Sequence, residues 1–434
     1  MFKENKKYKV KYRRRNLKYI IYFYLIIFSL FILFILIDQI RFLSIPTTQI
    51  YSLLTLLILT FSCYLFHTSK YSLSEVQRIK AKLLNVIQYN KLFIEDKTIN
   101  PYYTLTSLYF VFYKNDEALF IEAYAHGAPY ALQSADLGKK IESALNLNLT
   151  DIKNTTASHI TFIFDLVKAE RLTITKEKIK SKRPSNIPLD SKKSWDFSKV
   201  PHALISGATG SGKTYMVFYL LLEFAKRGAD IYLIDPKRSD LYSLQSSIPN
   251  GSNKVASNPN TIAKVLRETN EVMNSRYKKM AAQSKNDVGL NYKDFGLRPI
   301  VIFFDEVAAA MEEDKKIGKE IDAYLKQLIL KGRQAGVFII LSTQKPNAEA
   351  ISTVIRDQVG LRIALGQLSK NGYRMALGDE WGELPSGETG VGKGFIFIDG
   401  KGWILPRPYE SPFLDLKSFN YREELYSALV TRAN

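Results

Sequence analysis

The stretch GATGSGKT, from Gly207 to Thr214, constrains this sequence more than any other. It fits the pattern G-x-x-x-x-G-K-[ST], in which a glycine-rich turn points backbone N–H groups at phosphates, the lysine reaches the outer phosphates and the last hydroxyl binds Mg²⁺. An apolar run ends at Ser206 just before the turn, and an apolar, helix-like run extends to Lys226 after it. A helix N-terminus then faces the phosphates, which favours a nucleotide site over a chance surface turn. The predicted nucleotide-binding residues are Gly207, Ala208, Thr209, Gly210, Ser211, Gly212, Lys213 and Thr214.

Two carboxylates, Asp305 and Glu306, follow the apolar run PIVIFF. At the end of a buried strand, the first carboxylate suits Mg²⁺ coordination and the second suits polarising the water that attacks the γ-phosphate. We therefore predict Thr214 and Asp305 as Mg²⁺ ligands and Glu306 as catalytic, the alternative being a buried strand that ends in a solvated acidic turn. Gln344 follows another apolar run, VFIILS, and is predicted to sense the γ-phosphate or orient water. The predicted cofactors are ATP and Mg²⁺.

The N-terminal part of the chain predicts a membrane anchor. Residues 1–18 carry nine Lys and Arg against one Glu, and residues 19–37 and 50–66 are apolar runs long enough to cross a bilayer. Together they predict a transmembrane hairpin over residues 19–67, since a cleaved signal peptide would have a shorter apolar region and a small-residue cleavage site. Because positive flanks stay inside, the protein is predicted in the cell membrane, with its N-terminus and its nucleotide-binding part on the cytoplasmic side. The basic flank could also bind anionic lipid.

A small α+β module is predicted over residues 72–175, with no catalytic or metal-binding pattern of its own. Its predicted helices lie near 76–89 and 135–145, and its predicted strands near 107–113, 118–123 and 159–164. Residues 176–193, basic and broken by two prolines, are predicted to be a linker. The net charge of +19 favours anionic partners. The single cysteine, Cys63, excludes an intramolecular disulfide.

Several motifs occur together in one order: VPHALISGATGSGKT, IDPK, FFDE, RQAGVFIILSTQKP and LRIAL. Between about residues 194 and 402 they resemble the motor domain of the FtsK/SpoIIIE family, so the motor is assigned to residues 194–434. The resemblance implies an α/β fold with a RecA-like P-loop NTPase core, a parallel sheet of strand order 5-1-4-3-2 and a homo-hexameric ring. Arg333 falls where the family places a catalytic arginine that reaches a neighbour's γ-phosphate. A surface arginine at a helix end is the alternative, and Arg362 and Arg374 stay open candidates.

The chain is similar to the short FtsK-like coupling proteins of conjugative plasmids and integrative elements. Its sequence after the motor leaves no room for the winged-helix module of chromosome-segregating members, and two spans replace the four common in larger ones. We therefore expect a membrane-anchored, ATP-driven double-stranded DNA translocase that grips DNA phosphates without sequence preference and feeds a conjugative channel, with relaxase and channel proteins as possible partners. The alternatives are a chromosome-partitioning pump, a type VII-like protein secretion ATPase, and a nucleotide-dependent scaffold with weak turnover.

Overall fold

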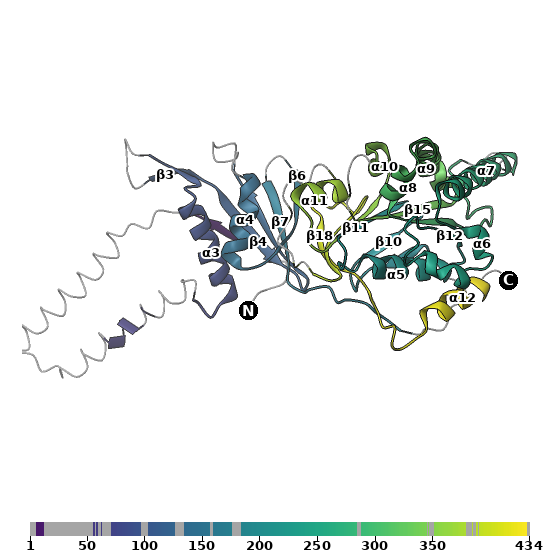
Figure 1. The fold of residues 1–434 in the computed structure, drawn as a ribbon. Coiled ribbons are helices and arrows are strands. Elements are labelled where there is room, and N and C mark those ends of the chain that lie inside the picture. The colour runs from purple at the N-terminus through teal and green to yellow at the C-terminus, as the bar shows by residue number, and fades with distance from the viewer. Residues whose placement is uncertain are drawn as a thin grey trace, which may run out of the picture. The chain divides into compact units, whose positions relative to one another are not determined.

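A computed structural model of the chain describes residues 6–12, 55–56, 58–59, 62, 71–96, 103–125, 134–156, 159–175, 184–283, 288–344, 346, 351–378, 384, 388 and 390–431. Among these residues, no helix has the length and apolar character needed to cross a membrane. The predicted spans 19–37 and 50–66 lie outside the described residues, apart from five scattered helical positions in the second. The chain divides into two compact units, Met1–Val167 and Lys168–Asn434, which we call the adaptor and the motor (Figure 1).

The adaptor is built on a five-stranded antiparallel sheet of order β1-β4-β5-β7-β6. Its core joins apolar side chains of the sheet, such as Phe110 and Phe162, to those of two helices, such as Leu83 and Ile141, all fully buried. Its elements are β1 (Tyr8–Lys11), α3 (Glu75–Tyr89), β2 (Phe93–Asp96), β3 (Tyr103–Ser107), β4 (Tyr109–Lys114), β5 (Ala118–Tyr124), α4 (Ser134–Leu145), β6 (Leu149–Thr156) and β7 (His159–Asp165). The predicted helices and the predicted β4–β5 hairpin are confirmed, whereas β6 and the β2–β3 hairpin were missed.

The basic N-terminus is not a separate flank, as the sequence suggested, because part of it is a strand of the adaptor. Strand β1 pairs antiparallel with β4, and Tyr8 lies opposite Phe112. Val10 and Tyr12 are buried, while Lys7 reaches back over the sheet to the Glu122 carboxylate at 2.7 Å. The apolar and aromatic residues alternate with lysines, so one face of the strand joins the core and the other carries the charge.

The motor contains an eight-stranded sheet of order β13-β12-β14-β15-β11-β16-β17-β18. The first six strands are parallel, and β17 and β18 add antiparallel strands at one edge. Strand β11 lies between β15 and β16 in the parallel part of the sheet. The strands are β11 (Ala203–Gly207), β12 (Asp230–Ile234), β13 (Val255–Ala256), β14 (Ile300–Asp305), β15 (Val337–Thr343), β16 (Leu361–Leu365), β17 (Lys393–Ile398) and β18 (Arg407–Glu410).

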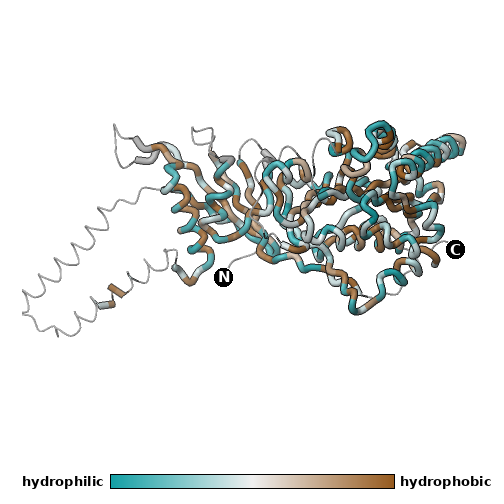
Figure 2. Tube along the Cα trace, viewed as in Figure 1, coloured by the Kyte–Doolittle hydropathy of each residue, from teal (hydrophilic) through white to brown (hydrophobic). Residues whose placement is uncertain are grey.

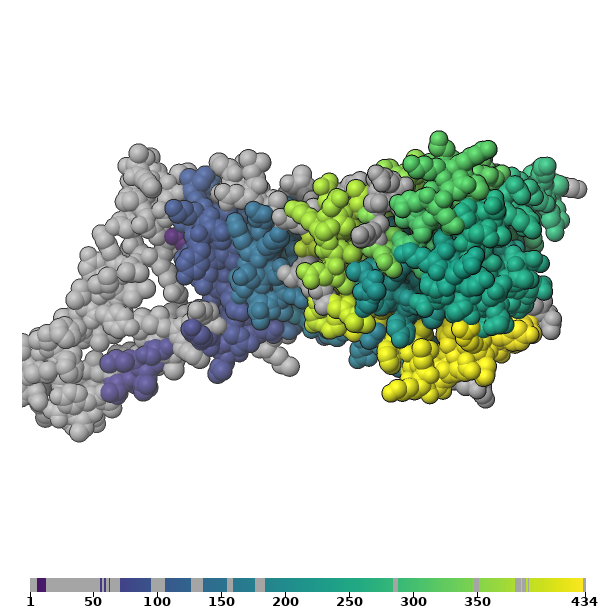
Figure 3. All heavy atoms as spheres, in the orientation of Figure 1, coloured from purple at the N-terminus to yellow at the C-terminus, as the bar shows by residue number. Residues whose placement is uncertain are grey.

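Helices cover both faces of this sheet, with α5 and α12 on one side and α7, α8 and α9 on the other (Figure 1). The central strands are apolar along their length, as expected for parallel strands buried on both faces (Figure 2). The C-terminal segment lies along the outside of the motor, where α12 contacts α5 (Figure 3). The helices are α5 (Lys213–Ala225), η2 (Tyr242–Ser247), α6 (Gly251–Lys254), α7 (Pro259–Gln283), α8 (Val307–Glu313), α9 (Lys315–Ala335), α10 (Thr353–Asp357), α11 (Lys370–Leu377) and α12 (Tyr421–Thr431).

Part of the predicted linker 176–193 belongs to the motor core instead. Strands β9 (Asn186–Pro188) and β10 (Ser194–Asp196) form an antiparallel hairpin, and Ile187 and Leu189 are fully buried in the same core as Trp195. Farther back, β8 (Thr173–Ile174) pairs in parallel with β19 (Phe413–Leu414). The apolar residues of this basic segment thus anchor it to the motor, and the motor begins earlier than the predicted residue 194.

Candidate functional site

The glycine-rich loop joins the end of β11 to the start of α5 in the centre of the motor sheet. Gly210 and Gly212 have φ angles of 79° and 92°, which L side chains rarely adopt. A Cβ at Gly212 would also lie 2.8 Å from the backbone N of Gly392. The loop therefore needs glycine at position 212 both for its backbone conformation and for its close approach to the neighbouring segment.

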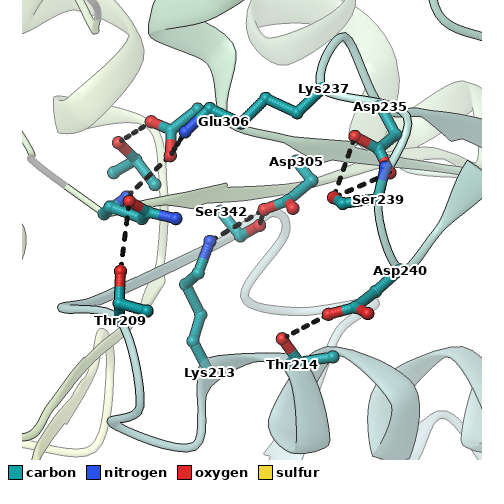
Figure 4. Close-up of polar contacts among 12 residues, drawn as sticks. Thr209, Lys213, Thr214, Asp235, Lys237, Ser239, Asp240, Asp305, Glu306 and Ser342 are labelled. Atoms are coloured by element: carbon teal, nitrogen blue, oxygen red, sulfur yellow. Dashed lines mark hydrogen bonds and ion pairs between the residues drawn. The ribbon is translucent and has the colours of Figure 1, made fainter.

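Strand register brings the predicted site residues to one edge of the sheet. Ser206 pairs with Thr343, and Asp305 pairs with Ser342, so the carboxyl ends of β11, β14 and β15 meet. There the Lys213 ammonium lies 2.8 Å from Asp305 Oδ1, and the Ser342 hydroxyl also donates to that carboxylate (Figure 4). Residues about ninety positions apart in the sequence thus become direct neighbours. This is the edge at which open α/β sheets bind ligands.

Glu306 lies beside this pair and is held on both carboxylate oxygens. Its side chain is 6% exposed, and its φ of 48° is unusual for a residue other than glycine. Oε1 accepts a hydrogen bond from the Thr343 hydroxyl at 3.0 Å. Oε2 accepts from Lys237 Nζ at 3.1 Å and from the backbone N–H of Gln344 at 3.3 Å. The Gln344 side chain in turn accepts a long, 3.5 Å contact from the Thr209 hydroxyl of the loop.

The segment after β12 supplies two site residues that the sequence analysis did not select. Lys237 contacts Glu306, and Asp240 Oδ2 accepts a hydrogen bond from the Thr214 hydroxyl at 3.0 Å. The turn between them is held by the fully buried Asp235, which accepts from the Ser239 N–H at 2.8 Å (Figure 4). The sequence carried a signal for this segment, because the IDPK motif, which ends at Lys237, is one of the motifs that resemble the FtsK/SpoIIIE family.

The backbone and side-chain groups at this edge fit a nucleoside triphosphate with Mg²⁺. The loop offers backbone N–H groups and Lys213, and oxygens of Thr214, Asp305 and Asp240 lie around it. The described residues contain no cluster of three or more His, Cys, Asp or Glu side chains that could hold a metal ion alone. The two carboxylates near Lys213 and Thr214 suit Mg²⁺, which is usually held by one or two carboxylates together with phosphates and water.

Arg333 does not join this site within the chain. It is exposed at the end of α9, just before β15 begins, and its Nε donates to the Ser198 carbonyl at 3.3 Å. Gln344 follows the opposite end of that strand, so the strand's seven residues separate the two positions by about 20 Å. Arg362 donates to the backbone carbonyls of Val359 and Leu377, which gives it a structural role.

Three hydrogen bonds connect the start of the motor to the back of the loop. Arg171 Nε donates to the Ser411 carbonyl at 2.7 Å, and the Ser411 N–H donates to the Gly392 carbonyl at 2.7 Å. The Gly392 N–H then donates to the Ser211 carbonyl at 2.7 Å. The loop is therefore supported from behind by segments from both ends of the motor.

At the other end of the sheet, His202 ties three elements together just before β11. It is fully buried and has a φ of 60°. Its Nδ1 accepts from the Ile339 N–H of β15 at 3.1 Å, so Nε2 carries the proton and donates to the Ile329 carbonyl of α9 at 2.9 Å. Burial lowers the pKa of His202 to about 4, because a charged imidazole would lose its hydration.

Comparisons with known proteins agree with this geometry. The sequence profile of the FtsK/SpoIIIE family matches residues 163–376. An FtsK domain-containing protein of Bacillus subtilis (strain 168), YdcQ, is 37% identical over 299 residues, which are 68% of this chain and 59% of that protein. A DNA translocase FtsK of Caldanaerobacter subterraneus subsp. tengcongensis is 29% identical over 244 residues, 54% of this chain and 33% of that protein.

Among solved structures, the monomer form of the pCW3 conjugation coupling protein TcpA with ATPγS shares the fold. It has a TM-score of 0.52 and 17% sequence identity, and the match covers 80% of this chain and 98% of that one. This chain spans less than two thirds of the length of both curated relatives.

Proposed function

The motor of this chain is a P-loop domain of the FtsK/SpoIIIE family, and from this premise we propose that the protein is a membrane-anchored ATPase that moves double-stranded DNA. The observation that carries the proposal is the convergence of Lys213, Asp305 and Glu306 at the carboxyl edge of the sheet. DNA is the cargo named for its translocase relatives, and the net charge of +19 suits a phosphate-rich partner. The fold shared with a conjugation coupling protein supports delivery to a transfer channel.

In this proposal the loop and Lys213 bind the phosphates of ATP, and Thr214 and Asp305 would hold Mg²⁺. A Mg²⁺ ion held there would neutralise the charge that develops on the phosphates. Glu306 polarises the attacking water. Gln344 senses the γ-phosphate, because its side chain contacts Thr209 of the loop and its backbone N–H contacts Glu306. Gln344 thus connects the loop to Glu306, so a small displacement of the loop would also shift the carboxylate that polarises the water.

The place of Arg333 supports a ring. Its position at the far end of β15 leaves it too distant to serve the loop of its own chain. An exposed arginine there can reach the γ-phosphate of an adjacent subunit, so each site would be completed by its neighbour, as in a homo-hexamer. ATP hydrolysis would then depend on the geometry between subunits, which is how a ring can couple turnover to movement.

The adaptor supports an anchor with an even number of membrane crossings. Strand β1 precedes the predicted spans 19–37 and 50–66, α3 follows them, and both elements pack into the same fold. A chain that leaves this fold to enter a membrane must therefore return to the same side before α3 begins. This requirement supports the predicted hairpin in the cell membrane, with the adaptor and motor on the cytoplasmic side.

The test is ATP turnover by the purified full-length protein with and without long double-stranded DNA. We expect DNA to raise turnover several-fold, and Glu306→Gln to retain ATP binding while turnover falls by at least about a hundredfold. Lys264→Met, which removes an exposed lysine from α7, is the matched control and should behave as wild type. Equal turnover with and without DNA would overturn the proposed cargo.

The ring is tested by mixing subunits. Arg333→Ala and Lys213→Ala proteins, each inactive alone, should recover turnover when they are mixed, because the intact loop of an Arg333→Ala subunit can be completed by the arginine of a Lys213→Ala neighbour. Mixtures that stay inactive would mean that Arg333 does not complete a neighbour's site, and full turnover by Arg333→Ala alone would mean that it has no catalytic role.

A further inference from the structure

One contact at the site is not explained by nucleotide binding: the ion pair between Lys237 and Glu306. Lys237 Nζ lies 3.1 Å from Glu306 Oε2, and the lysine side chain is 44% exposed while the glutamate is 6% exposed. The pair therefore joins a buried carboxylate to a cation that solvent can reach. The inference drawn from it rests on the proposed ATPase function.

This contact occupies Oε2 and lowers the basicity of Glu306, which makes the carboxylate a weaker base for activating water. Its Oε2 already accepts from Lys237 and Gln344, and Oε1 accepts from Thr343. A carboxylate that polarises water needs a lone pair aimed at that water and works best when no cation neutralises it. Of the three partners, Lys237 is the only one that brings a charge, so its departure would change the basicity of Glu306 most.

The segment that carries Lys237 also contacts the predicted Mg²⁺ ligand. Asp235 fixes the turn through the Ser239 N–H, and Asp240 at its end accepts from the Thr214 hydroxyl. The same turn thus contacts both the phosphate loop and Glu306. Its solvent side carries Lys237 and the exposed Arg238, a pair of cations suited to phosphate oxygens.

We propose that Lys237 is a positioning residue that holds Glu306 at rest when no DNA is bound, and that the phosphates of bound DNA compete with Glu306 for the Lys237 ammonium. When a phosphate takes the Lys237 ammonium, Glu306 keeps its neutral hydrogen bonds to Thr343 and Gln344 and regains a free lone pair on Oε2. Hydrolysis then speeds up only when DNA is engaged. The contact is a two-state element whose balance DNA shifts.

The resting contact is tested first without nucleotide or DNA. Urea unfolding of the full chain, followed by tryptophan fluorescence, is measured for wild type, Lys237→Met, Glu306→Gln and the double variant. Removing Lys237 should raise the unfolding equilibrium constant about fivefold in wild type and less than twofold when Glu306 is already Gln. Equal effects in both backgrounds would show that the pair is not coupled and would overturn the proposal.

Measurements of ATP turnover test whether DNA releases Glu306 from Lys237. Lys237→Met should raise the kcat measured without DNA about fivefold and leave the KM for ATP unchanged. The stimulation of turnover by DNA should then be about fivefold smaller in this variant than in wild type. Lys237→Arg should restore the resting rate because it keeps the charge, and Lys264→Met should match wild type. An unchanged or lower DNA-free kcat in Lys237→Met would refute the resting role, and full DNA stimulation of that variant would refute release by DNA.

The outcomes separate this inference from the proposed function. Absence of ATP turnover in wild type would refute the ATPase itself, whereas the unfolding measurement reports the Lys237–Glu306 coupling without any turnover. A DNA-stimulated wild type whose Lys237→Met variant keeps the resting rate would leave the translocase standing and remove Lys237 from its control.

Discussion

Acid should destabilise the motor through His202. In the folded protein, burial lowers its pKa from 6.5 to about 4. Between these two pH values the unfolded chain binds a proton that the folded chain does not, so the free energy of unfolding is intact above about pH 6.5 and declines as the pH falls toward 4. The pKa difference corresponds to about 3 kcal/mol in total, of which about 2 kcal/mol is lost between pH 7.5 and pH 5.

The measurement is urea unfolding at pH 7.5 and pH 5 by tryptophan fluorescence, which reports the motor alone. All three tryptophans, Trp195, Trp381 and Trp403, lie in the motor unit. His202→Asn tolerates the φ of 60° and does not titrate in this range. The variant should be less stable at pH 7.5, by about 1–3 kcal/mol, because the Ile329 carbonyl loses its donor.

The decisive quantity is the difference between the two pH values. Wild type should lose about 2 kcal/mol more than His202→Asn does between pH 7.5 and pH 5. His159→Asn, in the adaptor, is the matched control and should keep the wild-type pH dependence of the motor. Equal losses in wild type and His202→Asn would refute the reasoning, because they would mean that His202 is not held neutral by its burial.

Three further predictions follow from single contacts. Gly336→Ala should lower the free energy of unfolding of the motor by at least about 2 kcal/mol in urea unfolding, because the φ there is 74° and a Cβ would overlap the Tyr292 ring; an effect below 0.5 kcal/mol, roughly that of a surface change, would contradict this. Lys7→Met should leave the Glu122 carboxylate buried without its cation and raise amide hydrogen exchange of residues 8–11 about tenfold, whereas Lys6→Met should not. Lys213→Ala should weaken ATP binding at least about a hundredfold in a fluorescence titration, and retained affinity would remove the loop lysine from phosphate binding.

The parts of the fold that sequence could predict are those with a local signature. The loop, its flanking strand and helix, and the strand that ends at Asp305 and Glu306 all lie where periodicity and the motif put them, because their apolar runs are long and uninterrupted. The contact between Glu306 and Gln344 follows from adjacent β14 and β15. No local pattern, however, indicates the positive φ of Glu306, which depends on the packing around it.

Both segments that the sequence analysis misplaced are rich in Lys and Arg. This charge favoured an exposed segment and outweighed the pattern of the apolar residues in the prediction. Strand β1 alternates Tyr8 and Val10 with lysines, a period-two pattern that signals a strand, yet the high charge favoured a solvated flank. Ile187 and Leu189 sit in a basic, proline-containing segment in the same way and are fully buried. In both places charged side chains point outward from strands whose other face joins a core.

The hydrogen bonds that run from Arg171 through Ser411 and Gly392 to Ser211 have a mechanical meaning. Arg171 lies close to the start of the motor unit, so a pull on the chain there would be shared by these bonds, the Glu170–Ser191 hydrogen bonds and the pairing of β8 with β19. The last acceptor of the series that begins at Arg171 is Ser211, a residue of the phosphate loop. In the membrane-anchored ATPase proposed above, tension between the anchor and the motor would therefore strain the loop that binds the nucleotide, and the rate of ATP turnover would depend on the load.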